Sequence, residues 1–280
     1  PGPDGKPQPL VRSHEIVNLP SATVGGVLLA EGMRRPASKA TVAVIADPVF
    51  RPDDPRVEKI SGGAEHDAVL QASRGGALES GNGRGVDLAR LRFSRREADV
   101  ITSLVPDASR RMEALDFDAS LETVTSGDLS GYSIVHIATH GLVDSARPEL
   151  SGLVFSLYDR KGRPQEGFLA LHGIYDLKLD ADLVVLSACD TALGKLVRGE
   201  GLIGLTRGFM YAGAPRVVAS LWTVDDRATA VLMERFYRGM LEKHETPAAA
   251  LRNAKISMLD DPRWSSPYYW AAFILEGDWR

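Results

Sequence analysis

The sequence predicts an α/β domain with a mainly parallel sheet that is flanked by helices on both faces. Continuous apolar, β-branched segments recur along the chain, as expected for strands that are buried on both faces. Amphipathic segments of helical length alternate with them, which is typical of βαβ units. Hydrophobic residues make up 44% and charged residues 25% of the 280-residue chain, an ordinary globular composition that excludes wholesale disorder.

The N-terminal third alternates between short ordered segments and a long loop. Residues 15–19 form a short extended segment, and residues 41–46 are β-branched and apolar like a buried strand. Residues 51–90 are poor in large apolar groups, which predicts a flexible surface loop inserted in the domain. Ser94 and Glu97 have the spacing of a capping box, which predicts that a helix begins there.

From residue 130 onward the expected elements follow one another regularly. Further strands are predicted at residues 132–138, 153–157, 183–188, 216–222 and 269–275. Helices are predicted at residues 168–177, 202–212 and 225–241, and one more is opened by Thr246 as the cap with Pro247 in the first turn.

Charge, hydropathy and cysteine content exclude several classes of protein. The formal net charge is −4 without a basic cluster, which argues against a nucleic-acid binder. No apolar run approaches the roughly 20 residues that cross a bilayer, and the first residues lack a signal peptide. Cys189 is the single cysteine, so no internal disulfide can form, and we expect a reducing cytoplasm. Because the sequence begins at Pro1, we expect a fragment, a processed product or an excised domain.

Two predicted strands run into residues that can carry nucleophilic chemistry. Strand 132–138 leads to His140 and strand 183–188 leads to Cys189, and the carboxyl ends of parallel strands meet at one edge of a sheet. A cysteine nucleophile needs a nearby imidazole, and the 49-residue separation agrees with that of caspase-type proteases. The N–H groups of Gly141 and Cys189 are candidates for an oxyanion hole. The alternative is that Cys189 is an inert buried residue.

Two other patterns suggest cofactors and are rejected. Residues 199–204 match G-x-G-x-x-G, but ten residues separate them from the preceding strand, whereas a dinucleotide fingerprint follows its strand at once. His136 and His140 have a metal-like spacing, but positions four apart on a strand lie roughly 13 Å apart. We therefore expect no metal site and interpret His136 as a packing residue.

Several sequence blocks resemble those of one protein family. The strongest are Val-His-Ile-Ala-Thr-His-Gly at residues 135–141 and Leu-Ser-Ala-Cys-Asp-Thr-Ala-Leu-Gly at residues 186–194. Weaker blocks lie at residues 19–22, 46–48, 199–205, 211–214, 218–226 and 268–273. Together they resemble CHAT domains, which are caspase-like, separase-related cysteine peptidases of clan CD, often found behind TPR repeats in bacterial proteins. The resemblance spans residues 1–280 as one domain, but a Pro-Phe segment common in the family is missing, which predicts truncation at the N-terminus.

The resemblance implies a catalytic dyad and no cofactor. Cys189 would attack a peptide carbonyl of a protein substrate, and His140 would act as general acid and base. The N–H groups of Gly141 and Cys189 would hold the oxyanion, and neither a metal nor an organic cofactor would be required. We expect a cytoplasmic peptidase that does not bind nucleic acid or membranes and is latent until a partner or a missing region, such as TPR repeats, activates it.

The residue that selects the substrate is less clearly marked. Asp226 resembles an acid of the separase segment that receives a basic side chain in the S1 pocket, and Asp190 and Asp225 are rivals. The alternative is that Asp225 or Asp226 merely caps the following helix. A second interpretation of the whole chain is a catalytically silent interaction module on the same fold.

Overall fold

A computed structural model defines the fold of most of the chain. It describes residues 8–21, 23, 26, 40–58, 88–126, 128–144, 147–187, 189–190, 200–222 and 224–279. Of residues 40, 128, 189, 190 and 200–203 it describes the backbone. Residues 59–87, most of the predicted 51–90 loop, lie outside the described residues, while residues 51–58 form turns.

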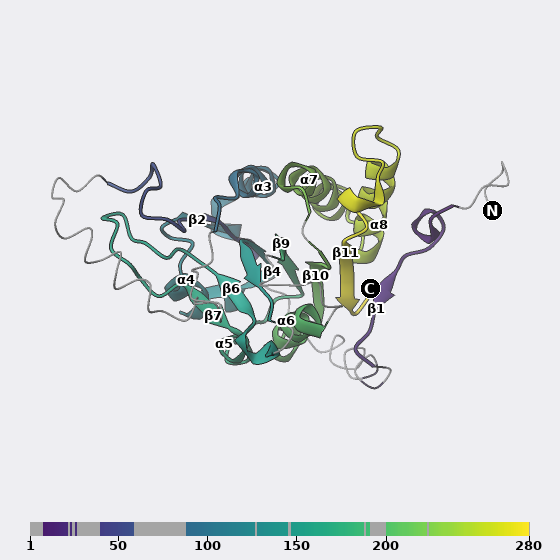
Figure 1. Cartoon of the computed structure of the whole chain (residues 1–280). Helices are drawn as coiled ribbons and strands as arrows, with labels where there is room; N and C mark the ends of the chain where they lie inside the picture. Colours follow the sequence, from purple (N-terminus) through teal and green to yellow (C-terminus); the bar gives the residue numbers. More distant parts are fainter. Residues whose placement is uncertain are drawn as a thin grey trace.

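Within the described ranges, seven strands form the main sheet in the order β1-β11-β10-β8-β4-β2-β3 (Figure 1). They are β1 (Val17–Asn18), β2 (Ala40–Pro48), β3 (Arg111–Asp116), β4 (Tyr132–Ala138), β8 (Leu183–Leu186), β10 (Arg216–Ser220) and β11 (Phe273–Gly277). All neighbours from β10 to β3 pair in parallel, whereas β11 is antiparallel to β10. The predicted mainly parallel sheet is confirmed.

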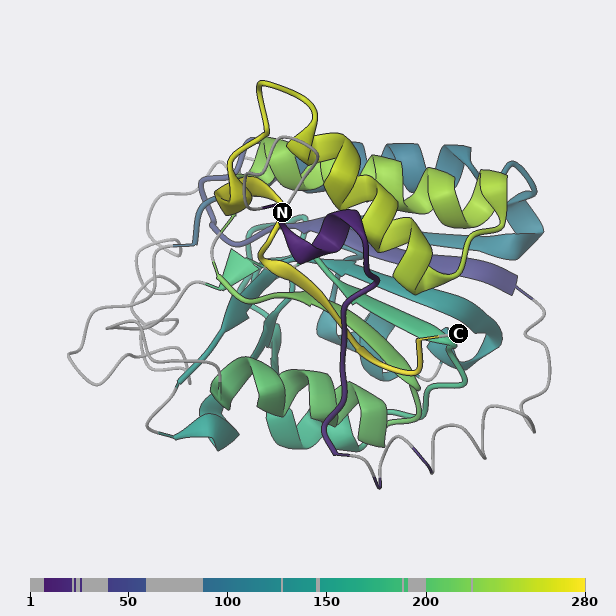
Figure 2. The ribbon, with the colours of Figure 1, turned by 90° about the vertical axis from the view of Figure 1, so that its right-hand side faces the viewer.

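Helices cover both faces of this sheet, as predicted (Figures 1 and 2). One layer contains α3 (Arg92–Ser103), α7 (Asp226–Lys243) and α8 (Pro247–Leu259), and the other contains α4 (Leu121–Thr125), α5 (Leu171–Tyr175) and α6 (Glu200–Tyr211). The side chains of β2 alternate between the two layers: Val42 and Val44 join the core under the first, and Ala43 and Ile45 join the core under the second. This alternation explains why residues 42–46 of the strand are all apolar.

A smaller sheet continues beyond the carboxyl ends of two central strands. Its order is β7-β6-β5-β9, formed by β7 (Phe168–Ala170), β6 (Gly152–Val154), β5 (His140–Leu142) and β9 (Cys189–Asp190). β5 follows β4 after one residue, and β9 follows β8 after two. Neighbouring β4 and β8 therefore deliver their continuations to the same small sheet.

Several element boundaries differ from the sequence prediction. Strand β6 covers Gly152–Val154 rather than residues 153–157, and β8 and β10 each end two residues earlier than predicted. The segment predicted as helix 168–177 is strand β7 followed by α5, and the closing strand begins only at Phe273. Helix α3 begins two residues before the predicted capping box, with Leu91 as its N-cap. The Ser94 hydroxyl donates to the Leu91 carbonyl at 2.7 Å, and Glu97 binds a buried histidine. Ser94 Oγ also accepts the Asp47 N–H, so both capping-box side chains make tertiary contacts.

The remaining helices include short 3-10 segments at Leu10–Arg12, Ala108–Arg110, Asp128–Gly131, Pro148–Leu150 and Pro267–Tyr269. The predicted start of α8 is confirmed, since Thr246 Oγ1 accepts the Ala249 N–H at 3.3 Å and Pro247 occupies the first turn. No helix within the described residues has the length and apolar character needed to span a membrane.

Candidate active site

The backbones of His140 and Cys189 lie side by side in the small sheet. Parallel strands β5 and β9 pair with His140 opposite Cys189 and Gly141 opposite Asp190. Adjacent strands are about 4.8 Å apart, so the two segments that the sequence analysis selected meet at the carboxyl edge of the main sheet. The side chains of Cys189 and Asp190 lie outside the described residues.

The His140 imidazole is buried, with only 4% of the residue exposed, and its two nitrogens differ. Nε2 is 2.7 Å from the Ala89 carbonyl oxygen, and because a carbonyl only accepts, Nε2 carries the proton. Nδ1 is buried and has no hydrogen-bond partner among the described atoms. The Phe50 ring lies against the imidazole, with centroids 4.9 Å apart. The arrangement leaves a basic lone pair on Nδ1.

Burial also fixes the charge of this histidine. Desolvation lowers the pKa of His140 below 6.5, and the Ala89 carbonyl opposes the shift only in part. His140 is therefore neutral at pH 7 and able to accept a proton. Such a histidine can act as a general base toward a thiol.

Ala89 contacts the candidate site, and nothing in the sequence indicated it. It belongs to the stretch interpreted as a solvated loop, and its contribution is a main-chain carbonyl, which any residue type supplies. No residue pattern could have identified it.

Gly141 is buried on β5, directly after the histidine. Its register with Asp190 places its main chain beside the segment that carries Cys189. The expected oxyanion hole of Gly141 and Cys189 N–H groups stays a prediction.

The two aspartates at the start of α7 have different roles. Asp225 is exposed and is the N-cap, with Oδ1 accepting the Ala228 N–H at 2.8 Å, as the capping alternative predicts. Asp226 is half-buried, and its Oδ2 accepts the Phe93 N–H at 3.0 Å. This bond ties α7 to the first turn of α3, four residues from Ala89 along the chain.

Burial raises the pKa of Asp226 to about 6, and the charges of Glu97, Asp225 and Asp47 act in the same direction against the Phe93 hydrogen bond. Since the ordinary value is 3.8, the folded state holds this proton between about pH 4 and 6 while the unfolded state releases it. The contribution of Asp226 to stability is therefore present below pH 4 and is lost as the pH rises through 6.

Replacing Asp226 with asparagine is expected to remove this pH dependence, because the amide oxygen can still accept the Phe93 N–H without ionising. The wild type loses unfolding free energy as the pH rises from about 5 to 7.5. In Asp226→Asn this loss should be smaller by about 1 kcal/mol after allowance for solvent screening. Urea unfolding at both pH values measures it, with Asp53→Asn as an exposed control. If the unfolding free energy of Asp226→Asn fell with pH as steeply as that of the wild type, Asp226 would not be the source of the pH dependence.

His136 is a packing residue, as predicted, and belongs to a buried polar network. Its Nδ1 is 3.0 Å from the Tyr237 hydroxyl and its Nε2 is 3.1 Å from Glu97 Oε2. The network joins β4 to α3 and α7. Among the described residues, no group of three or more His, Cys, Asp or Glu side chains is placed to hold a metal ion.

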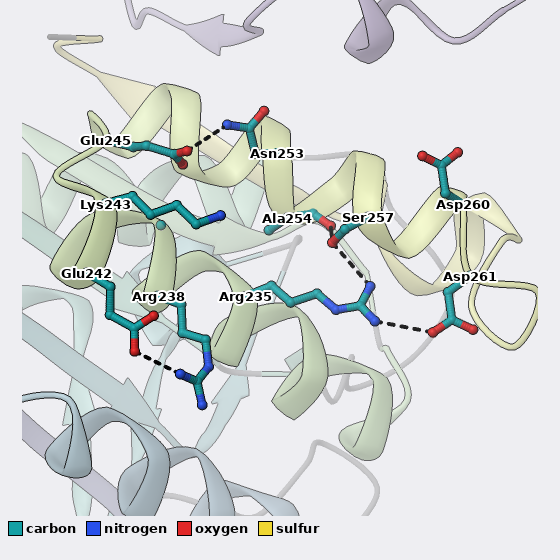
Figure 3. A pocket seen from close by; sticks show the side chains of 11 residues that line it. Arg235, Arg238, Glu242, Lys243, Glu245, Asn253, Ala254, Ser257, Asp260 and Asp261 are labelled. Atoms are coloured by element: carbon teal, nitrogen blue, oxygen red, sulfur yellow. Dashed lines mark hydrogen bonds and ion pairs between the residues drawn. The ribbon is translucent and has the colours of Figure 1, made fainter.

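A cavity of about 600 Å³ lies elsewhere, between α7 and α8 (Figure 3). Its charged side chains engage one another: Arg238 donates to Glu242 at 2.8 Å and Arg235 to Asp261 at 3.2 Å. None of the residues around His140 lines it. It is therefore separate from the candidate site.

Comparisons with known proteins identify a family and more distant relatives. A family model described as CHAT domain matches residues 1–278. Tetratricopeptide repeat protein 28 of Mus musculus is 35% identical and that of Homo sapiens 36% identical, each over 113 residues. The match covers 40% of this chain and 4% of either relative, so this chain spans a small part of their length.

Solved structures are similar at low identity. The Arg-specific cysteine proteinase gingipain R has a TM-score of 0.49 at 13% identity, with 86% of this chain and 49% of that chain covered. In the Saccharomyces cerevisiae separase–securin complex, the matched chain has a TM-score of 0.49 at 13% identity. That match covers 94% of this chain and 14% of the other.

Proposed function

The chain belongs to the CHAT domain family, and from this premise we propose that it is a cysteine endopeptidase in which Cys189 and His140 form the catalytic dyad. The observation that carries the proposal is the register of β5 and β9, which sets the backbone of His140 opposite that of Cys189. The neutral, buried imidazole with its free Nδ1 supports the role of His140 as the base.

In the proposed reaction, His140 Nδ1 takes the proton of the Cys189 thiol, and the thiolate attacks a peptide carbonyl. The N–H groups of Gly141 and Cys189 bind the oxyanion of the tetrahedral intermediate. Collapse breaks the C–N bond, and the His140 imidazolium protonates the departing amine. Water then hydrolyses the thioester with His140 again acting as the base, which regenerates the thiol.

We further propose cleavage after a basic residue, with Asp226 as the acid that receives the basic side chain. Asp226 is half-buried and uses one carboxylate oxygen for Phe93, and a substrate cation beside it would favour its ionised form. Asp225 is committed to capping α7, which weakens it as a rival. The main chain of Asp190 lies opposite Gly141, so Asp190 remains an alternative.

The proposal is tested by digesting a diverse peptide library with the purified protein and reading new termini by mass spectrometry. Cleavage should occur after Arg or Lys and disappear in Cys189→Ala, because the thiolate is the nucleophile. Equal cleavage by the variant would show that another agent cuts the peptides. Cysteine-dependent cleavage without a basic preference would refute the proposed specificity and the role of Asp226 but leave the dyad standing.

A silent interaction module is the second candidate, favoured by the tetratricopeptide repeat proteins among the relatives. Alkylation of Cys189 by iodoacetamide in the native protein separates the two. A peptidase should react quickly and in a His140-dependent manner, whereas an inert cysteine should react only after unfolding. As part of the peptidase proposal, the enzyme is cytoplasmic and stays latent until a partner or a TPR region activates it.

A further inference from the structure

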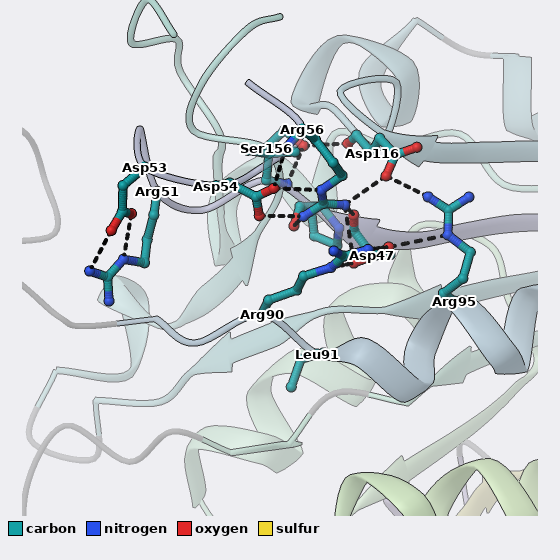
Figure 4. Close-up of polar contacts among 12 residues, drawn as sticks. Asp47, Arg51, Asp53, Asp54, Arg56, Arg90, Leu91, Arg95, Asp116 and Ser156 are labelled. Atoms are coloured by element: carbon teal, nitrogen blue, oxygen red, sulfur yellow. Dashed lines mark hydrogen bonds and ion pairs between the residues drawn. The ribbon is translucent and has the colours of Figure 1, made fainter. Parts of the chain in front are cut away.

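A cluster of three aspartates and three arginines lies beside the segment that contacts His140 (Figure 4). Its members are Asp47, Asp54, Asp116, Arg56, Arg90 and Arg95. Asp47, at the carboxyl end of β2, is fully buried and contacts all three arginines. A buried carboxylate of this kind is retained only where its partners satisfy it.

Arg90 binds the Asp47 carboxylate through two parallel hydrogen bonds. Its Nε is 2.8 Å from Oδ1 and its terminal nitrogen is 2.6 Å from Oδ2. Bidentate pairing of a planar guanidinium with a carboxylate restricts both position and orientation. The backbone at residue 90 is thereby fixed relative to the end of β2.

Asp47 also binds the first turn of α3. Its N–H donates to Ser94 Oγ at 3.1 Å, and its carboxylate accepts from Arg95 Nε at 3.1 Å. Asp47 itself adopts φ +52°, a left-handed conformation that costs a non-glycine residue energy. Surrounding contacts that over-determine a residue can hold such a conformation, and the bonds to Arg90, Ser94 and Arg95 do so here.

Ala89 lies immediately before Arg90, and its carbonyl is the acceptor for His140 Nε2. The Arg90 pair with Asp47 ties the residue next to Ala89 to the main sheet, and the bonds of Ser94 and Arg95 to Asp47 anchor the stretch that follows. Asp47 is therefore linked to the imidazole indirectly. It binds the Arg90 side chain, and the peptide group between Ala89 and Arg90 carries the carbonyl that binds His140.

We propose that Asp47 and Arg90 form a positioning clamp that holds the Ala89 carbonyl against His140 and so keeps the imidazole proton on Nε2 and the lone pair on Nδ1. Within the described residues, neither side chain hydrogen-bonds the His140 imidazole, and both act as positioning residues. The inference rests on the proposed function for its catalytic meaning, but the tautomer of His140 can be measured without any turnover.

The physical reason is tautomer selection. A neutral imidazole exchanges its proton between two nitrogens, and the group bonded to one nitrogen decides which form is populated. If the Ala89 carbonyl moves, the proton can shift to Nδ1, and the position that must accept the thiol proton is then occupied. A misplaced orienting group can lower turnover by about 100-fold.

The test is ¹⁵N NMR of the imidazole nitrogens of His140 in the full chain, assigned with His140→Gln. The wild type should show a protonated Nε2 and an unprotonated Nδ1, and Arg90→Ala should move both shifts toward the average of the two tautomers. Arg90→Lys keeps the ion pair with Asp47 but not the bidentate geometry, so intermediate shifts are expected. It also serves as the test if Arg90→Ala does not fold.

Arg263→Ala is the matched control, because Arg263 pairs with Asp261 through two bonds of 3.0 and 2.8 Å beyond α8. It should leave the shifts unchanged. Wild-type shifts in folded Arg90→Ala and Arg90→Lys, or equal changes in Arg263→Ala, would overturn the clamp.

Turnover provides the second readout. In Arg90→Ala, kcat for a cleaved peptide should fall about 10- to 100-fold with KM nearly unchanged, because orientation of the base is lost rather than substrate binding. If cleavage by the wild type does not depend on Cys189, the proposed function fails, and the NMR shifts alone decide whether the clamp exists. If the shifts change and kcat falls together, both proposals stand.

Discussion

Peptide cleavage by His140→Ala is expected to be about 10²- to 10⁴-fold slower than cleavage by the wild type, the usual contribution of a general acid–base residue. Two losses combine in this variant. The thiol of Cys189 loses the Nδ1 lone pair that takes its proton, and the leaving amine loses its acid. We would measure kcat/KM with a peptide identified from the library.

The pH profile of kcat/KM gives this prediction a second signature. Because burial lowers the pKa of His140 below 6.5, the imidazole is neutral throughout the neutral range. The wild-type rate should decline only at acidic pH, where the base is protonated. His140→Ala should lack this acidic decline.

His172→Ala is the matched control, since His172 is exposed on α5. It should cleave as the wild type does. Activity of His140→Ala within about threefold of the wild type would show that His140 is not the general base, because acid–base catalysis contributes at least about 10²-fold.

The parts of the fold that the sequence revealed are those where burial dictates composition. β2, β4, β8 and β10 are mainly apolar because helices cover both faces of the sheet. β3 at the sheet edge is only half-buried and mixes Arg111 and Glu113 with apolar residues, so no strand pattern marks it. β5 and β9 are too short for periodicity to appear.

The candidate site likewise contains residues that the sequence reveals and residues that it does not. His140 and Cys189 stand out in the sequence because their side chains are chemically capable and follow apolar strands. Ala89 acts through its main chain, and Arg90 acts through a partner 43 positions away. Such contributions depend on tertiary position alone. The misplaced capping box has the same cause, because Asp47 and His136 engage Ser94 and Glu97.

Removing the Asp47 carboxylate is expected to be the most destabilising change in this region. Asp47→Ala leaves Arg56, Arg90 and Arg95 without a carboxylate that each of them contacts. Breaking one partner of a buried ion pair costs about 3–5 kcal/mol because the remaining charge stays uncompensated. These arginine side chains are 15–31% exposed and two retain Asp116, so we expect about 3 kcal/mol.

Urea unfolding of the full chain measures this loss, and Asp53→Ala is the matched control. Asp53 pairs with Arg51 at 3.0 Å in the same stretch, but its side chain is 69% exposed. Exposed ion pairs contribute about 1 kcal/mol or less, because water screens the charges and solvates each one alone. A loss below about 1 kcal/mol in Asp47→Ala would mean that water solvates the three arginines equally well. Asp47 would then not hold Arg90 in place, and a fixed tautomer of His140 would require another cause.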